Sequence, residues 1–250
     1  MGPSSTTPRR PFSVTRQPDN TSCGPTCLHG IYRFFDHDIS VDQVIDETPA
    51  LKDGGTLAVF LGIDALKRGF RATIYTYNLE VFDPSWFTTP DVDLSDRLRR
   101  QAEFKRNMKL REATAGYLEF LRLGGTIRFE DLTRKLLRDQ LKAGLPILTG
   151  LSSTYLYRTP REYGPNLDYD DVRGEPCGHF VVLCAYDPEQ RLVTVADPLT
   201  PNPLSNEPLY AVEIDRVLGA ILLGVLTYDA NLLVVSPAQE KPFRAAPRGG

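Results

Sequence analysis

A cysteine stands at a structural junction in residues 17–32, which read QPDNTSCGPTCLHGIY. A polar, turn-rich lead ends at Cys23, and an apolar stretch of helical character follows it. A thiol attacks a carbonyl group only as the thiolate, and its ordinary pKa of about 8.5 leaves little of that form at neutral pH. The unpaired N–H groups and the positive dipole end at the start of a helix stabilise a thiolate. The position of Cys23 therefore predicts a nucleophile for acyl transfer.

Two residues near Cys23 suit the same chemistry. Acyl transfer needs hydrogen-bond donors for the oxyanion of its tetrahedral intermediate. Gln17, six residues before the cysteine, is a candidate donor, and the backbone N–H of Cys23 is a second. A glutamine taken alone is more often an ordinary surface residue, and only its place before a helix-starting cysteine favours this role. We expect Gly24 to leave room beside the sulfur for the backbone of a substrate.

The chain has three histidines, and one of them is placed to act as a general base. His29 falls inside the first predicted helix and His37 in the polar turn after it, whereas His179 begins the apolar strand GHFVVLC. Without Cys23, a core histidine bonded to a carbonyl would be an equally good interpretation of His179. A general base needs a partner that orients its second ring nitrogen. Asp197, at the end of the returning strand, is the candidate.

The segment 178–198 is predicted to be a β-hairpin, because the Asp-Pro-Glu sequence at 187–189 is a turn signal between two apolar strands. A loop of two or four residues centred after the proline would put His179 opposite Pro198 and turn Asp197 to the other face. An odd loop centred on the proline would put His179 opposite Asp197 on one face. The catalytic interpretation therefore predicts a loop of three or five residues, or a β-bulge.

Hydrophobic periodicity predicts the elements that position these residues. Helices dominate the first half of the chain and strands the second, which indicates an α+β fold with two lobes. We expect one domain at 13–237, with a helical lobe at 13–143, a β lobe at 144–237, and disordered tails at 1–12 and 238–250. The predicted helices are 23–35, 41–47 (capped by Ser40), 56–68, 93–122 as one or two helices, 131–143 and 213–222; the predicted strands are 71–77, 126–129, 146–151 and 231–236 in addition to the hairpin.

Composition excludes several classes of protein. The 250 residues are 41% hydrophobic and 24% charged, as in an ordinary globular protein, and the net charge of −3 argues against a nucleic-acid surface. No apolar run approaches the ~18 residues that a membrane span needs, and the first residues lack the apolar core of a secretory signal. Four cysteines are too few for a disulfide scaffold. We expect a cytoplasmic protein with reduced thiols and no cofactor, and leave its oligomeric state open.

Taken together, these motifs resemble the papain-like cysteine peptidases. They are most similar to the motifs of the C39 and C39-like family. The matching residues are Gln17, the Cys-Gly-Pro run at 23–25, the Gly-His pair at 178–179 and the Asp-Pro pair at 197–198. The resemblance implies a papain-like two-lobe fold, with a cysteine at a helix start packed on an antiparallel sheet lobe that carries the histidine. It also implies four roles: nucleophile for Cys23, general base and then acid for His179, orienting residue for Asp197, and oxyanion donor for Gln17.

The implied activity is thiol-dependent hydrolysis of a peptide or amide bond through an acyl-thioester on Cys23. Amidases, deamidases and transpeptidases use the same chemistry and remain alternatives. Family members fused to ABC transporters trim leaders after Gly-Gly; this chain has no ATP-binding motif, so it resembles a free-standing member and that specificity does not carry over. We expect a peptide or protein substrate, a cleft shaped by residues 93–122 and 152–176, and substrate contacts from Gly24, Gly178, Tyr155 and Tyr157.

Two other classes compete with this interpretation. The cysteines and histidines at 23–29 and 177–179 are numerous enough for tetrahedral zinc, and Cys23 and Cys27 share a helix face. However, the Cys-x-His spacing after Cys177 is not a common zinc spacing, and Cys27 is more simply a buried small apolar residue. The other alternative is a non-catalytic module that keeps a peptide cleft. Degenerate copies usually lose the thiol or the histidine, and this chain has both.

Overall fold

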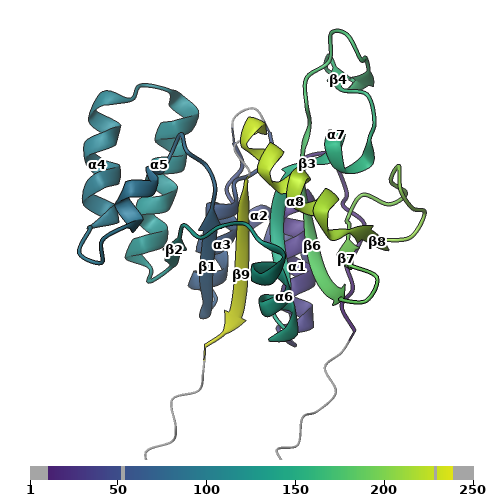
Figure 1. The fold of residues 1–250 in the computed structure, drawn as a ribbon, viewed down its shortest axis with the longest axis horizontal. Helices are drawn as coiled ribbons and strands as arrows, with labels where there is room; N and C mark the ends of the chain where they lie inside the picture. The colour runs from purple at the N-terminus through teal and green to yellow at the C-terminus, as the bar shows by residue number, and fades with distance from the viewer. Residues whose placement is uncertain (1–10, 52–53, 228–229, 239–250) are drawn as a thin grey trace, which may run out of the picture.

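The computed structural model describes residues 11–51, 54–227 and 230–238 (Figure 1). At its centre lies a seven-stranded sheet with the order β2-β1-β9-β3-β6-β7-β8. Its neighbouring strands pair antiparallel, except that β1 and β2 run parallel. The seven strands are β1 (Phe70–Thr76), β2 (Thr126–Arg128), β3 (Ile147–Ser152), β6 (Gly178–Asp187), β7 (Leu192–Ala196), β8 (Leu209–Glu213) and β9 (Asn231–Pro237).

Helices cover both faces of the sheet, as Figure 1 shows with α6 and α8 in front of it and α1 and α3 behind. Even-numbered residues of β6, such as Phe180, pack in one core with α1 and α3, and odd-numbered ones, such as Val181, pack in a second core with α6 and α8. Burial on both faces explains why β6 is a continuous apolar run rather than an alternating one. The helices are α1 (Cys23–Phe34), α2 (Val41–Glu47), α3 (Ala58–Lys67), α4 (Leu94–Phe104), α5 (Met108–Arg122), α6 (Arg134–Lys142), α7 (Ser153–Tyr157) and α8 (Ile214–Leu223), with short 3₁₀ turns η1 (Pro84–Phe87) and η2 (Gly224–Thr227).

Helix α1 begins at Cys23, as predicted, because its sequence favours a start there. Pro25 lies in the first turn, where its missing N–H leaves no hydrogen bond unmade. Every residue from Cys23 to Tyr32 is buried, so α1 runs through the core rather than along the surface. The predicted cap of α2 is also confirmed, since the Ser40 side chain accepts a hydrogen bond from the backbone N–H of Gln43. The thiol is therefore carried on a helix that the core holds in place.

The α+β prediction is confirmed, but the predicted division into two lobes does not follow the sheet. Strands β1 and β2 come from residues 13–143, and they belong to the same sheet as the strands of 144–237. Strand β9, at the end of the described chain, pairs with both β1 and β3 and so joins the two halves. The boundary at 143/144 therefore runs through one continuous sheet.

The tails predicted at 1–12 and 238–250 fall mostly outside the described residues, and the described end of the first one is not a tail. Phe12 is buried, and its ring lies 5.7 Å from that of Phe34. It also packs beside Gly30, where an added Cβ would lie 3.3 Å from the Phe12 ring. The folded part of the chain therefore begins before residue 13, because an aromatic residue there fills a gap over α1.

The charged segment 93–122 forms two helices, α4 and α5, which Figure 1 shows at the β1–β2 side of the sheet. Asn107 separates them and caps α5 through the backbone N–H of Leu110. Helix α5 packs closely on α3 at two glycines. An added Cβ on Gly62 would lie 2.7 Å from Phe120, and one on Gly116 would lie 2.8 Å from Phe60. The apolar face of this segment thus serves packing on α3.

The polar segment 152–176 is partly ordered into secondary structure. It contains α7 and the small hairpin of β4 (Glu162–Tyr163) and β5 (Asp168–Tyr169), which stands away from the main sheet in Figure 1. The Asp170 carboxylate accepts hydrogen bonds from the backbone of Val172 and Arg173 and from the Arg173 side chain. Asp170 therefore helps to order this segment itself, and we call residues 152–176 the polar arm. Among the described residues, no helix combines the length and the hydropathy needed to cross a bilayer.

Candidate active site

The hairpin β6–β7 brings His179 and Asp197 to one face through a β-bulge. Asp187 pairs with Leu192, so the loop consists of the four residues 188–191. The register then shifts between Leu183 and Ala185, which leaves Cys184 as the extra residue. Beyond the bulge Val182 pairs with Ala196, so the odd-numbered residues of β6 share a face with Asp197. The prediction of an odd loop or a bulge is confirmed, and the bulge is the device used.

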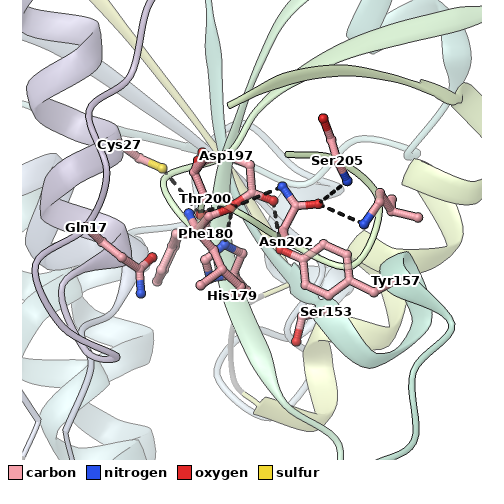
Figure 2. Close-up of polar contacts among 12 residues, drawn as sticks. Gln17, Cys27, Ser153, Tyr157, His179, Phe180, Asp197, Thr200, Asn202 and Ser205 are labelled. Atoms are coloured by element: carbon pink, nitrogen blue, oxygen red, sulfur yellow. Dashed lines mark hydrogen bonds and ion pairs between the residues drawn. The ribbon is translucent and has the colours of Figure 1, made fainter. Parts of the chain in front are cut away.

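His179 and Asp197 form a buried pair, drawn at the centre of Figure 2. The His179 Nε2 atom lies 2.8 Å from the Asp197 Oδ1 atom, and the two residues are 6% and 0% exposed. Because Nε2 is engaged with the carboxylate, Nδ1 is the ring nitrogen left for the thiol. The side chain of Cys23 lies near enough to the imidazole to contribute to the rise of the His179 pKa. The structure therefore brings Cys23, His179 and Asp197 together in the order that a base-activated nucleophile requires.

The Asp197 carboxylate is fully hydrogen-bonded. Oδ1 faces His179 and also accepts the backbone N–H of Leu199 at 2.9 Å. Oδ2 accepts the hydroxyl groups of Tyr157 and Tyr210, each at 2.7 Å. Burial works to raise the pKa of this carboxyl, but the charge of His179 and these hydrogen bonds lower it below its ordinary value. Asp197 is therefore an anion in a site without solvent.

His179 is correspondingly held in its protonated form. Burial alone works to lower its pKa, but the charge and hydrogen bond of Asp197, followed by the contribution of Cys23, raise the pKa of His179 to about 10. A protonated imidazole beside a sulfur stabilises the thiolate. The charge of Asp197 thus holds an imidazolium near the Cys23 sulfur.

Cys23 faces a small cavity of about 180 Å³ at the start of α1. It is 9% exposed, and Ser22 before it makes no side-chain capping bond, so that side chain does not occupy the first N–H groups of the helix. Glycine, threonine and asparagine form most of the cavity wall, with one lysine. The lining residues are Asn20, Thr21, Cys23, Leu51, Gly54, Gly55, Thr56, Lys109, Gly178, Phe180 and Thr227.

A larger cavity, of about 380 Å³, lies at strand β8 and is lined in part by Arg158, Tyr210 and Arg216. It holds neither Cys23 nor His179. We therefore assign the chemistry to the smaller cavity, because a reacting carbonyl has to reach the sulfur.

Gln17 lies next to this group of residues, and in the view of Figure 2 His179 separates it from Tyr157. It is 9% exposed, its backbone N–H donates to the Pro198 carbonyl at 2.9 Å, and its Nε2 donates to the Asp19 carbonyl at 2.7 Å. An amide nitrogen carries two hydrogens, so the bond to Asp19 fixes its direction and leaves one hydrogen for an oxyanion. Gln17 is not among the residues that line the cavity at Cys23, so its role as an oxyanion donor stays a prediction.

The structure gives no support to two of the expected substrate contacts. The space that a side chain on Gly24 would take is filled, because an added Cβ would lie 2.7 Å from Thr56 and 3.2 Å from Leu61 and Phe180. Gly24 is thus needed for packing α1 and leaves no room for a substrate. Tyr157 is buried with its hydroxyl on Asp197, so it lies behind the His179–Asp197 pair.

The other two expected contacts have different surroundings. Gly178 lines the cavity together with Cys23, as expected for a substrate contact. Tyr155 is exposed, and its ring packs against Gly219 of α8. It is not among the residues that line the cavity, so the structure gives no support to a contact between Tyr155 and the substrate.

The tyrosine bonds to Asp197 were missed by sequence reasoning. Tyr210 lies on β8 directly opposite Val195 of β7, and β8 was not among the predicted strands. The short alternating run LYAVE at 209–213 was the available signal. It is only five residues long, which makes it a weak one.

Two of the residues considered for zinc have other partners in the fold. The Cys27 sulfhydryl donates to the Phe180 carbonyl at 3.3 Å, as Figure 2 shows, and burial raises the pKa of this thiol well above its ordinary value. The Nε2 atom of His179 is engaged with Asp197. Within the described part of the chain, no three His, Cys, Asp or Glu side chains come together in a group able to hold a metal ion.

Comparisons with known proteins point to one family. The model of the Peptidase_C39 like family matches residues 100–212, a segment that includes His179 and Asp197 but not Cys23. A search of the curated proteins finds no match to the chain.

Three solved structures are similar to the chain at low sequence identity. The peptidase domain of Streptococcus ComA, a bifunctional ABC transporter, is 13% identical, with 91% of this chain and 99% of that one covered and a TM-score of 0.41. A protein described as a C39-like peptidase from Bacillus anthracis is 12% identical (91% and 96% covered, TM-score 0.49). Xylellain, a cysteine protease from Xylella fastidiosa, is 14% identical (92% and 84% covered, TM-score 0.43). Likeness at this level says nothing of substrate or activity. The family match agrees with the resemblance in the second half of the motifs: over residues 100–212, less than half of its length, the chain is similar to the C39-like peptidases.

Proposed function

We propose that the chain is a cysteine peptidase that hydrolyses a peptide or amide bond through an acyl-thioester on Cys23. The observation that carries this proposal is the His179–Asp197 pair at 2.8 Å, with its imidazole near the sulfur of a helix-starting cysteine. The cavity at that sulfur gives a carbonyl group access to it. An intact thiol next to a paired imidazole favours an enzyme over a binding module that has lost its chemistry.

The first half of the reaction forms the acyl-enzyme. The Cys23 sulfur attacks the carbonyl carbon, and the carbonyl oxygen becomes an oxyanion that accepts hydrogen bonds from Gln17 Nε2 and from the backbone N–H of Cys23. His179 holds the proton that left the thiol and gives it to the leaving nitrogen as the C–N bond breaks. The amine product departs, and the acyl group remains on sulfur.

The second half releases the acid. His179, now neutral, takes a proton from a water molecule as the water oxygen attacks the thioester carbon. The C–S bond breaks, and the sulfur returns to its pairing with the imidazolium. A transpeptidase would differ only in using an amine in place of water, and an amidase only in the leaving group. We place hydrolysis first, since water needs no binding site of its own.

The substrate follows from the cavity wall. Gly54, Gly55 and Gly178 contribute no side chains to it, and its volume of about 180 Å³ is small. We therefore expect a peptide or protein substrate with a small side chain next to the bond that is cut. The four cysteines are all free, which supports the cytoplasmic location that we propose for the enzyme.

The test compares two cysteines one helical turn apart. Cys23→Ala removes the sulfur in the cavity, whereas Cys27→Ala removes a buried thiol that bonds only the Phe180 carbonyl among the described residues. With a fluorogenic peptide library, we expect hydrolysis to be lost in Cys23→Ala and kept in Cys27→Ala. Hydrolysis that survives in purified Cys23→Ala would show that the proposed function is wrong.

A further inference from the structure

Two tyrosine hydroxyls converge on the oxygen of Asp197 that does not face the histidine. Tyr157 comes from α7 and Tyr210 from β8, and each donates to Oδ2 at 2.7 Å. We infer that Tyr157 and Tyr210 are positioning residues, which keep Asp197 ionised and aligned on His179 and so maintain the reactive state of Cys23. This inference rests on the proposed function, and it adds two residues that touch neither the substrate nor the reacting sulfur.

The first argument is the complete burial of the carboxylate. Asp197 is 0% exposed, and an anion in such a place is unstable unless donors replace its hydration. The oxygen Oδ1 has the His179 imidazole and the Leu199 N–H as donors. The tyrosines are the donors that Oδ2 has among the described residues. Without them, one buried oxygen of an ionised group would be left without a partner.

The second argument is direction. The donors lie on both oxygens, so a rotation of the carboxylate about the Cβ–Cγ bond would break bonds at both ends at once. Tyr157 and Tyr210 belong to elements on different sides of the hairpin, since α7 follows β3 and β8 pairs with β7. Such a two-sided support keeps Oδ1 on the Nε2 atom of His179, which in turn leaves Nδ1 for the thiol.

The third argument is that both phenols keep their protons and so remain able to donate. Burial, and after it the charge of Asp197, raises the pKa of Tyr157 and of Tyr210 far above the ordinary value. Both hydroxyls therefore stay neutral through the range in which an enzyme works. They stabilise the carboxylate without adding a charge that titrates.

The groups around Asp197 show what would change if the hydroxyls were lost. The titratable groups that interact with it are Tyr157 of α7, His179 of β6, Tyr210 of β8 and Cys27 of α1, with Cys23 acting through the histidine. His179 is the cation of this set. With fewer donors, Asp197 would take up a proton at a higher pH, His179 would then lose its counter-charge, and the thiolate would lose its support.

The experiment measures the reactivity of Cys23 with iodoacetamide as a function of pH, with the modified residue identified by mass spectrometry. The variants are Tyr157→Phe, Tyr210→Phe and the double variant. Tyr77→Phe is the matched control, because the Tyr77 hydroxyl is buried with no hydrogen-bond partner in the described part of the chain. We expect the acid limb of the profile to move up by roughly one pH unit for each hydroxyl removed near Asp197. Tyr77→Phe should leave it in place.

A Tyr157→Phe or Tyr210→Phe variant that unfolds at the same temperature as Tyr77→Phe and keeps the wild-type acid limb would overturn the inference. If the double variant does not fold, the two single variants still decide the question. Alkylation needs no substrate, so this result is separate from the proposed function. Failure of every peptide to be cut would contradict the peptidase proposal and leave the tyrosine inference standing.

Discussion

The backbone N–H of Gln17 donates to the carbonyl of Pro198 at 2.9 Å. This bond joins the segment before α1 to the residue that follows Asp197, some 180 positions away in the chain. The Leu199 N–H, one residue further, bonds the Asp197 carboxylate itself. The expected oxyanion donor and the residue that orients the histidine are therefore parts of one hydrogen-bonded frame, and a shift in either would be transmitted to the other.

Gln17→Ala should lower kcat by about 10²–10³ and leave KM nearly unchanged, because an oxyanion donor acts on the transition state more than on the bound substrate. Steady-state kinetics with a cleaved peptide measures both constants. Gln43→Ala is the control, since that glutamine bonds Glu47 on the exposed side of α2 and should have no effect. A raised KM with an unchanged kcat would instead make Gln17 a substrate-binding residue.

Asp197→Asn should lower both reactivity and stability. The amide NH₂ would replace one of the two oxygens and face the two donors that now bond it, and the charge that holds His179 protonated would be gone. Breaking a buried ion pair costs about 3–5 kcal/mol in free energy of unfolding. We expect Cys23 alkylation at pH 7 to slow by about 10²–10⁴. Asp171→Asn, at an exposed acid of the polar arm, is the control and should behave like the wild type in both assays.

The free energy of unfolding should depend on pH through His179, with a definite sign. The pKa of His179 is raised to about 10 in the folded protein, above its ordinary value of 6.5. The stabilisation that this shift represents is fully present below pH 6.5 and is lost as the pH rises to about 10. Thermal unfolding of wild type and His179→Gln between pH 6 and 11 measures it. We expect the difference in melting temperature to shrink across that interval; a constant difference would contradict the ion pair.

Much of the site could be predicted from the sequence, because its parts carry local signals. Cys23 precedes Pro25 and an apolar helix, and His179 and Asp197 flank a hairpin with a recognisable turn. Each of these patterns depends on residues close in the chain. The sheet order could not be predicted in this way, because the place of β9 between β1 and β3 depends on packing across the whole chain.

The register of the hairpin shows where local signals end. The Asp-Pro-Glu turn signal fits several loop lengths. The structure has a four-residue loop, which without a bulge would turn Asp197 away from His179. Cys184 is the bulged residue, and it looks like any other apolar residue of the strand. The need for a bulge could be predicted from the pairing of two functional residues, but its position could not.

The sequence also could not show whether Gly24 serves the packing of α1 or makes room for a substrate, and a substitution there tests the packing role. An added Cβ there would lie 2.7 Å from Cγ2 of Thr56, so Gly24→Ala should lower the free energy of unfolding by about 1–3 kcal/mol. Thr56→Ser removes that methyl group and keeps the hydroxyl that donates to the Pro49 carbonyl. The double variant should therefore recover part of the lost stability, measured by denaturant unfolding. Cys23 alkylation at a temperature where all variants are folded should stay within a few-fold of wild type. If Gly24→Ala instead keeps full stability and raises KM, the glycine makes room for substrate and our packing role for it is wrong.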